Sequence, residues 1–172
     1  MNSIRKLSIL LLLAAASTTV PVLAQETIPD SLPNQYVFTI EAAITDALVL
    51  GDSVDGQRLA IPITGGSVHG ADINGEVIPG GADYQVLRAD GSRWIKAVYM
   101  IRTDDGVIIN VENQGVIVPP ADAQATAYFR TSPRFTAPLG KYGWLNSSIF
   151  VCGVRFNPQQ PGRVLIDVYK VL

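Results

Sequence analysis

Asp83 is the carboxylate of this sequence that is best placed for chemistry. It follows the Gly80-Gly81 pair and begins a predicted strand, and Gln85 comes two residues later. Beside Gln85 and Lys96, the Asp83 carboxylate could hold a ligand hydroxyl or accept a proton, whereas burial without such partners would be unfavourable. The alternative is a structural role, either in a cross-strand ion pair or as a turn cap.

His69 is the only histidine, and no other side chain type has an unperturbed pKa so close to neutrality. It is therefore a candidate general acid or base. Glu76 could act beside it as the carboxylate of a pair, although nothing in the spacing requires the two side chains to meet. The alternative is a histidine that is simply solvated in a loop.

Aromatic and polar side chains supply candidates for ligand binding. An inward Arg130 could clamp a carboxylate while Tyr99 or Trp144 packs against the apolar body of the same ligand. An outward Arg130 would be only a surface charge. Trp144 and Asn146 flank Leu145, an arrangement that suits either the rim of a pocket or a plug that closes a barrel.

Several kinds of chemistry lack their motif. No Gly-x-Ser-x-Gly, Ser-x-x-Lys or glycine-rich phosphate loop is present, so hydrolase, kinase and nicotinamide-dependent functions have no support. One histidine and one cysteine cannot form a zinc cluster, and we expect neither a metal nor a cofactor. The segment 103–106, Thr-Asp-Asp-Gly, precedes Val-Ile-Ile, which favours a hairpin turn over a calcium loop. Cys152 lies in an apolar run, which favours a buried and unreactive thiol.

Short strands must position these side chains. Turn-forming pairs such as Gly65-Gly66, Gly80-Gly81 and Asp90-Gly91 recur along the chain, and runs rich in Val, Ile, Tyr, Phe and Thr lie between them. This pattern predicts an all-β sandwich or barrel. The predicted strands span residues 36–50, 58–64, 84–88, 93–103, 107–112, 125–131, 147–155 and 164–171, and residues 121–127 are the only candidate helix.

The clearest hairpin turn is at residues 89–92, Ala-Asp-Gly-Ser. If this turn places Gln85 opposite Lys96, it also places Asp83 opposite Val98. Because side chains alternate along a strand, Lys96 would then share a face with Asp83 and could be its partner.

The N-terminal residues predict export. Arg5 and Lys6 precede the apolar run 10–16 and a small-residue site that ends at Ala24, which indicates a secretory signal peptide over residues 1–24. The run is shorter than the about 20 residues of a membrane-spanning helix, and the alternative is a signal anchor. We expect a periplasmic or secreted protein without a membrane segment after cleavage. It would have a flexible leader over residues 25–35 and one barrel domain over 36–172.

The net charge, the length and the cysteine count of the cleaved chain limit its class and its partners. Cleavage after Ala24 would change the formal charge from −2 to −4, and no basic stripe for nucleic acid is present. The remaining chain has the length of one ordinary domain. With a single cysteine, its stability must come from packing and not from a disulfide framework.

Several strings of residues match a known family in the family's own order. They are IPITGG (61–66), GEVIPGGAD (75–83), TDDG (103–106), YFRT (128–131), WLN (144–146) and VY (168–169). With these strings, residues 36–172 resemble the family catalogued as domain of unknown function 3237, or uncharacterised protein family 0311. The resemblance implies a closed barrel of about eight mostly antiparallel strands, similar in outline to lipocalins, with an interior able to hold a small ligand. It implies no activity.

This chain also departs from that family's pattern. Val98-Tyr99 stands where members usually carry an Arg-Tyr pair in the strand before the Thr-Asp-Asp-Gly turn. Any role of that arginine is therefore lost, and Lys96 could replace it as the partner of Asp83. His69 is also unusual for its position.

Three functions from different classes remain open. The first is an exported barrel that binds a small, partly apolar, aromatic or carboxylate-bearing molecule. The second is a cofactor-independent lyase, isomerase or cyclase in which Asp83, His69, Tyr99 and Lys96 are acid–base and orienting groups. The third is a structural or self-associating module that forms a homo-oligomer.

Overall fold

Nine strands and one short 3-10 helix make up the part of the chain that this computed structural model describes, residues 31–172 except 123, 124 and 158. The predicted signal peptide lies outside these residues. Within them, no helix is long and apolar enough to cross a membrane. The elements are β1 (Asn34–Ile44), β2 (Leu48–Ser53), β3 (Gly56–Gly70), β4 (Gly75–Leu87), β5 (Arg93–Thr103), β6 (Ile108–Val118), β7 (Tyr128–Thr136), η1 (Gly143–Ser147), β8 (Phe150–Phe156) and β9 (Arg163–Val171).

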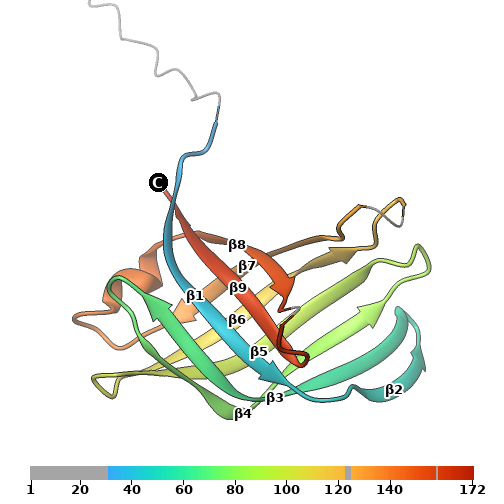
Figure 1. Ribbon diagram of the computed structural model, residues 1–172, viewed down its shortest axis with the longest axis horizontal. Coiled ribbons are helices and arrows are strands. Elements are labelled where there is room, and N and C mark those ends of the chain that lie inside the picture. Colours follow the sequence, from blue (N-terminus) through green and yellow to red (C-terminus); the bar gives the residue numbers. More distant parts are fainter. Residues whose placement is uncertain (1–30, 123–124, 158) are drawn as a thin grey trace, which may run out of the picture. The chain divides into compact units, whose positions relative to one another are not determined.

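The strands close into a barrel because β1 has a hydrogen-bonded partner on each side (Figure 1). Ile40 of β1 pairs with Ile166 of β9 and also with Val68 of β3. The ring runs β1-β9-β8-β7-β6-β5-β4-β3 and returns to β1, with every pairing antiparallel, while β2 extends the edge of β3. The predicted closed antiparallel barrel of about eight strands is confirmed.

Both Gly-Gly pairs lie inside long strands and not at turns, contrary to the prediction. The three residues Pro79–Gly81 of β4 stand opposite the single residue Tyr99 of β5, so β4 bulges there. Gly65 and Gly66 form a similar irregularity in β3, with φ values of 139° and 136° that favour glycine. Such bulges bend a strand and increase its twist, which lets β3 and β4 curve around the barrel. The predicted strands 58–64 and 84–88 are therefore parts of much longer ones.

The two ends of the barrel are packed differently. At one end, the Phe135 ring lies 5.6 Å from Phe38 and 5.0 Å from Phe150, and Leu145 of η1 is fully buried against this group. In Figure 1, η1 lies at the left, and the connections after β4 and β6 lie at the right. The half of the barrel away from η1, hereafter the far half, has small inward residues such as Ala42. Aromatic rings thus fill one half and leave space in the other.

The β4–β5 hairpin has a register one residue away from the predicted one. Its turn comprises residues 88–92, one more than expected, so Asp83 pairs with Ala97 and Tyr84 pairs with Lys96. Because a shift of one residue turns a side chain to the other face, Lys96 points outward. Asp83 and Gln85 share the inner face with Ala97.

Other boundaries also differ from the predictions. The predicted strand 36–50 is broken at residues 45–47, and β1 begins at Asn34, inside the predicted leader. In the described part of segment 121–127 there is no helix. The Asp122 carboxylate there accepts a hydrogen bond from the Ala125 amide at 2.9 Å, a local turn that competes with helix formation. The predicted strand 147–155 starts late because residues 143–147 form η1.

Gly81→Ala should destabilise the barrel. A Cβ atom at Gly81 would lie 2.5 Å from the Cβ of Tyr99 and 2.6 Å from the carbonyl oxygen of Val98. Overpacking of this kind lowers the free energy of unfolding by about 1–3 kcal/mol, which urea denaturation would measure. Gly153→Ala is the matched control, because a Cβ there meets no atom within 4 Å. An equal loss in both variants would contradict the proposed packing of Tyr99 against the bulge.

Candidate functional site

A cavity of about 50 Å³ lies inside the far half of the barrel. Its wall consists mostly of aliphatic side chains, and Phe129 is the one phenylalanine among them. Four of its lining residues are polar, and they come from four strands: Asp83 from β4, Tyr99 from β5, Asn113 from β6 and Thr131 from β7. These four strands are neighbours in the sheet, so the polar groups gather on one side of the cavity.

Each of these residues has a buried polar atom without a hydrogen-bond partner. The atoms are Asp83 Oδ1, Tyr99 OH, Asn113 Oδ1 and Thr131 Oγ1, and among the described residues no other buried side-chain nitrogen or oxygen lacks one. Roughly nine-tenths or more of buried polar groups in proteins are paired. The cavity is therefore suited to hold polar atoms that do not belong to the chain, and its volume would admit one or two water molecules.

Gln85 holds the other oxygen of the Asp83 carboxylate. Its Nε2 donates to Asp83 Oδ2 at 2.6 Å, and its own Oε1 accepts a hydrogen bond from Arg93 Nη1 at 3.4 Å. Burial raises the pKa of Asp83, while the hydrogen bonds from Gln85 and from the backbone of Lys96 oppose that rise. Asp83 thus has one oriented oxygen and one free oxygen that faces the cavity.

Tyr99 is 3% exposed and packs against the glycine bulge of β4. Burial raises the pKa of its phenol, and the neighbouring Cys152 and Asp83 raise it further. The phenol therefore keeps its proton across the neutral range. With no acceptor in the protein, that proton is free for a hydrogen bond to a molecule in the cavity.

The structure places His69 and Glu76 on the outside of the barrel. His69 lies within β3 and not in a loop, and its Nε2 is 2.8 Å from the hydroxyl of Ser67. Glu76 forms an ion pair with Arg102 at 2.6 Å. Neither residue lines the interior cavity, so the two do not join Asp83.

Lys96 and Arg130 both lie on the outer face, contrary to the prediction for Lys96 and in agreement with the outward alternative for Arg130. Lys96 lies 3.8 Å from Glu112 on the outer face, because of the changed hairpin register. The Arg130 guanidinium lies 5.3 Å from the centre of the Tyr128 ring and donates to the carbonyl oxygen of Phe129 at 2.8 Å. Neither cation can therefore act as the partner of Asp83 inside the barrel.

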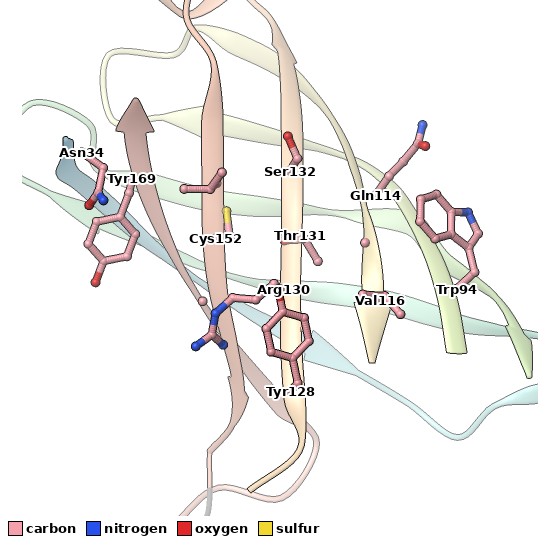
Figure 2. A pocket seen from close by; sticks show the side chains of 13 residues that line it. Asn34, Trp94, Gln114, Val116, Tyr128, Arg130, Thr131, Ser132, Cys152 and Tyr169 are labelled. Atoms are coloured by element: carbon pink, nitrogen blue, oxygen red, sulfur yellow. The ribbon is translucent and has the colours of Figure 1, made fainter. Parts of the chain in front are cut away.

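Arg130 instead lines a hollow of about 640 Å³ on the outer surface. Figure 2 shows it beside Tyr128, with Trp94 and Tyr169 on opposite sides of the hollow. This hollow is much larger than the interior cavity. We nevertheless place the candidate site inside the barrel. Among the residues that line the hollow, only Thr131 has a buried polar atom without a hydrogen-bond partner, and Thr131 also lines the interior cavity with the other three such residues.

The structure places Trp144 and Asn146 at the η1 end. The Asn146 amide exchanges two hydrogen bonds with the backbone of Ala137, at 2.8 and 2.9 Å. Trp144 packs 5.9 Å from the Phe150 ring. These contacts match the plug alternative for this segment, and neither residue lines the interior cavity.

Asn113 and Thr131 were missed by the sequence reasoning. Both interrupt an inward apolar stripe: Asn113 follows Ile109 and Val111 at intervals of two, and Thr131 lies between Phe129 and Pro133 in the same way. A polar residue in such a stripe is a usable signal, since it predicts a buried polar group. Within the described residues, no group of three or more histidine, cysteine, aspartate or glutamate side chains could hold a metal ion.

Asp83→Asn should stabilise the protein at neutral pH. Because burial raises the pKa of Asp83 above the ordinary value of 3.8, the folded state binds the proton more tightly. The wild type therefore loses stability as the pH rises through the folded pKa. The advantage of the variant should be absent below about pH 3.8, grow as the pH rises and be complete above the folded pKa, as measured by urea denaturation across the pH range.

Asp90→Asn is the control of opposite sign. Hydrogen bonds from Ser92 hold the pKa of Asp90 below its usual value, so its stabilising effect is present at neutral pH and is lost as the pH falls. This variant should be less stable than the wild type at neutral pH. The same sign of effect in both variants would contradict the description of Asp83 as a buried, penalised carboxyl.

Cys152 should resist thiol-modifying reagents in the folded protein. Burial raises the pKa of its thiol to about 12, and the nearby Thr131 hydroxyl only partly opposes that rise. Since a thiol is a weak hydrogen-bonding group, this contact does not satisfy Thr131 Oγ1. We expect modification at about pH 8 only as fast as the protein unfolds, as a time course with a disulfide reagent would show.

Comparison with known proteins confirms the resemblance. The family described as "Protein of unknown function (DUF3237)" matches residues 33–171. A UPF0311 protein of Rhodopseudomonas palustris is 38% identical over 153 residues, which cover 83% of this chain and 98% of that protein. A UPF0311 protein of Clostridium acetobutylicum is 38% identical over 149 residues, which cover 80% of this chain and 92% of that protein.

Solved structures share the fold. The crystal structure of the Rhodopseudomonas palustris protein, described as a conserved protein of unknown function, has a TM-score of 0.75 at 38% identity and covers 84% of this chain and 100% of that one. A beta-barrel-like protein of Acinetobacter baumannii has a TM-score of 0.76 at 27% identity, covering 86% of this chain and 100% of that one.

Proposed function

This chain belongs to the DUF3237 family, whose description assigns no activity, and on that premise we propose that the protein binds a small molecule with a neutral polar group inside its barrel. The observation that carries the proposal is the gathering of four unpartnered, buried polar atoms around one cavity. An unsatisfied buried polar group lowers stability by about 1–3 kcal/mol. Four such groups around one cavity are expected where a bound ligand forms the missing hydrogen bonds and so offsets the loss of stability.

The polar group of the ligand should be neutral. The residues that line the cavity include no lysine, arginine or histidine, so a carboxylate would meet Asp83 without a balancing cation. The hydroxyls of Tyr99 and Thr131 can donate, and the oxygens of Asp83 and Asn113 can accept. A hydroxyl or carbonyl group fits this set. The carboxylate-bearing ligand of the sequence prediction depended on an inward Arg130 and is not part of the proposal.

The rest of the ligand should be apolar. A volume of about 50 Å³ admits a polar head and little more, so the body of the molecule must extend past the wall of the cavity. Ile44 and Val164, which are only partly buried, lie at the strand ends on this side of the barrel. Their side chains would contact an aliphatic or aromatic body as it leaves the cavity.

A purely structural barrel would not favour this interior. Apolar side chains of similar shape at Asn113 and Thr131 would remove two unsatisfied groups without a loss of packing, which commonly raises stability. Polar residues that lower stability are expected at functional sites. The cavity therefore supports a binding function over a structural or self-associating module.

We also propose that the protein meets its ligand outside the cytoplasm. The support is the N-terminal sequence, in which Arg5 and Lys6 precede an apolar run and a small-residue site at Ala24. The intact mass of the protein purified from its own host should be that of residues 25–172, and the mass of the full chain would contradict cleavage after Ala24.

Small probes test the binding proposal. We expect phenol and cyclohexanone to bind, and the anionic cyclohexanecarboxylate to bind at least about tenfold more weakly, as saturation-transfer NMR would show. A double variant, Asn113→Leu with Thr131→Val, should weaken the binding of both neutral probes about tenfold or more, because it removes two of the polar atoms.

Arg130→Gln is the matched control on the same strand as Thr131. It alters the outer hollow and leaves the interior cavity unchanged, so the affinity for both neutral probes should stay the same. Failure of both neutral probes to bind would overturn the proposal. A loss of binding in Arg130→Gln alone would move the site to the outer surface.

A further inference from the structure

Resting on the proposed function, we infer that the cavity catalyses proton transfer at the carbon next to a neutral ligand's carbonyl group, with Asp83 as the base and Tyr99 as the hydrogen-bond donor to the carbonyl oxygen. The reaction class is enolisation, which includes hydrogen exchange beside a ketone and migration of a double bond into conjugation with that ketone. It requires neither a metal nor a redox cofactor.

The geometry of the two strands supports these roles. Asp83 pairs with Ala97, and Tyr99 lies two residues further along β5 on the same inner face. Asp83 and Tyr99 are therefore diagonal neighbours, with Cα atoms typically about 7–8 Å apart. A ketone fits between two side chains at such a separation, with its carbonyl oxygen toward Tyr99 and the adjacent carbon toward Asp83.

The free atoms of the two residues are the ones that the reaction needs. Asp83 Oδ2 is held by Gln85, which leaves Oδ1 unpaired and facing the cavity. The Tyr99 hydroxyl has no protein acceptor for its proton. Both residues line the same cavity, so a base and a donor are available to one bound molecule.

The proposed step balances without a co-reactant. Asp83 Oδ1 takes the proton as the C–H bond breaks, and that electron pair forms the carbon–carbon double bond of the enolate. The carbonyl π electrons move to the oxygen, where the Tyr99 hydroxyl stabilises the developing negative charge by hydrogen bonding. Asp83 then returns a proton to the same carbon or, where the enolate is conjugated with a carbon–carbon double bond, to the far end of that conjugated system.

The protonation states suit these roles at neutral pH. Burial raises the pKa of Asp83, which makes the carboxylate a stronger base than an exposed aspartate. Burial also raises the pKa of Tyr99, so its hydroxyl remains a donor. The buried thiol of Cys152 does not line the cavity, and its high pKa disfavours covalent catalysis by this side chain.

Gln85 is a positioning residue in this scheme. Its amide fixes Asp83 Oδ2, and Arg93 in turn fixes the orientation of that amide through its carbonyl oxygen. The bond from Gln85 favours the ionised form of Asp83 and so lowers its pKa. Gln85 thus sets both the direction and the basicity of the free oxygen.

Hydrogen exchange on a bound ketone tests the inference. In D₂O with cyclohexanone as the probe, the wild type should accelerate the loss of the α-proton NMR signal about 100-fold over buffer. Asp83→Asn should lower the rate to within about threefold of buffer, and Tyr99→Phe should lower it about tenfold or more. Arg130→Gln should exchange at the wild-type rate, since its side chain lies outside the cavity.

The pH profile distinguishes a positioning role of Gln85 from a structural one. The wild-type exchange rate should rise as Asp83 ionises. In Gln85→Leu the midpoint of that rise should move to higher pH, because the carboxylate has lost a hydrogen bond. A lower rate with an unchanged midpoint would contradict the role given to Gln85 and leave only a packing effect.

Separate outcomes decide the inference and the proposed function. If saturation transfer shows that cyclohexanone binds while the wild type exchanges its α-protons no faster than buffer, the catalytic inference is overturned and the binding function stands. If Asp83→Asn exchanges at the wild-type rate, Asp83 is not the base. If cyclohexanone and phenol both fail to bind, the binding function and the inference fall together.

Discussion

Closure of the sheet by β1 is the constraint on which the rest of the structure depends. This strand forms backbone hydrogen bonds along both edges, with β9 on one side and β3 on the other, so the main barrel has no free edge there. The approach of β1 and β3 is close enough that a Cβ at Gly66 would lie 1.9 Å from the carbonyl oxygen of Glu41. The absence of a side chain at that position is therefore a condition for closure.

Closure also explains why the interior is divided into two parts. The rings of Phe38, Phe135 and Phe150, with Leu145 from η1, fill one half of the barrel. The inward residues of the far half are mostly aliphatic, with one phenylalanine and four polar residues among them, and no helix covers them within the described part of the chain. The tightly packed half thus supports the half that contains the cavity. Such support allows a scaffold to hold a few polar groups in fixed positions.

Alternation of residue types predicted much of this from the sequence alone, and it failed where the alternation is interrupted. The β strands and their antiparallel pairing follow from a period of two and the family resemblance, whereas the predicted hairpin register would have put Tyr99 on the face opposite Asp83. The Gly-Gly pairs were interpreted as turns because glycine serves both turns and bulges, and only the partner strand distinguishes them. The hairpin register depended on one additional residue in the turn, and that residue moved Lys96 from the inner face to the outer one.

The sequence by itself determined that the chain is nearly all β and carries no motif for metal or nucleotide chemistry, since composition, turn residues and periodicity are local properties, and the closed barrel was implied by the family resemblance. Only the tertiary structure decided which polar residues meet. Asp83, Tyr99, Asn113 and Thr131 are far apart along the chain and lie on different strands, so their shared cavity depends on the register of three strand pairs. Register is a sum of many side-chain contacts across the barrel, and a shift of one residue in any pair would turn one of these groups outward.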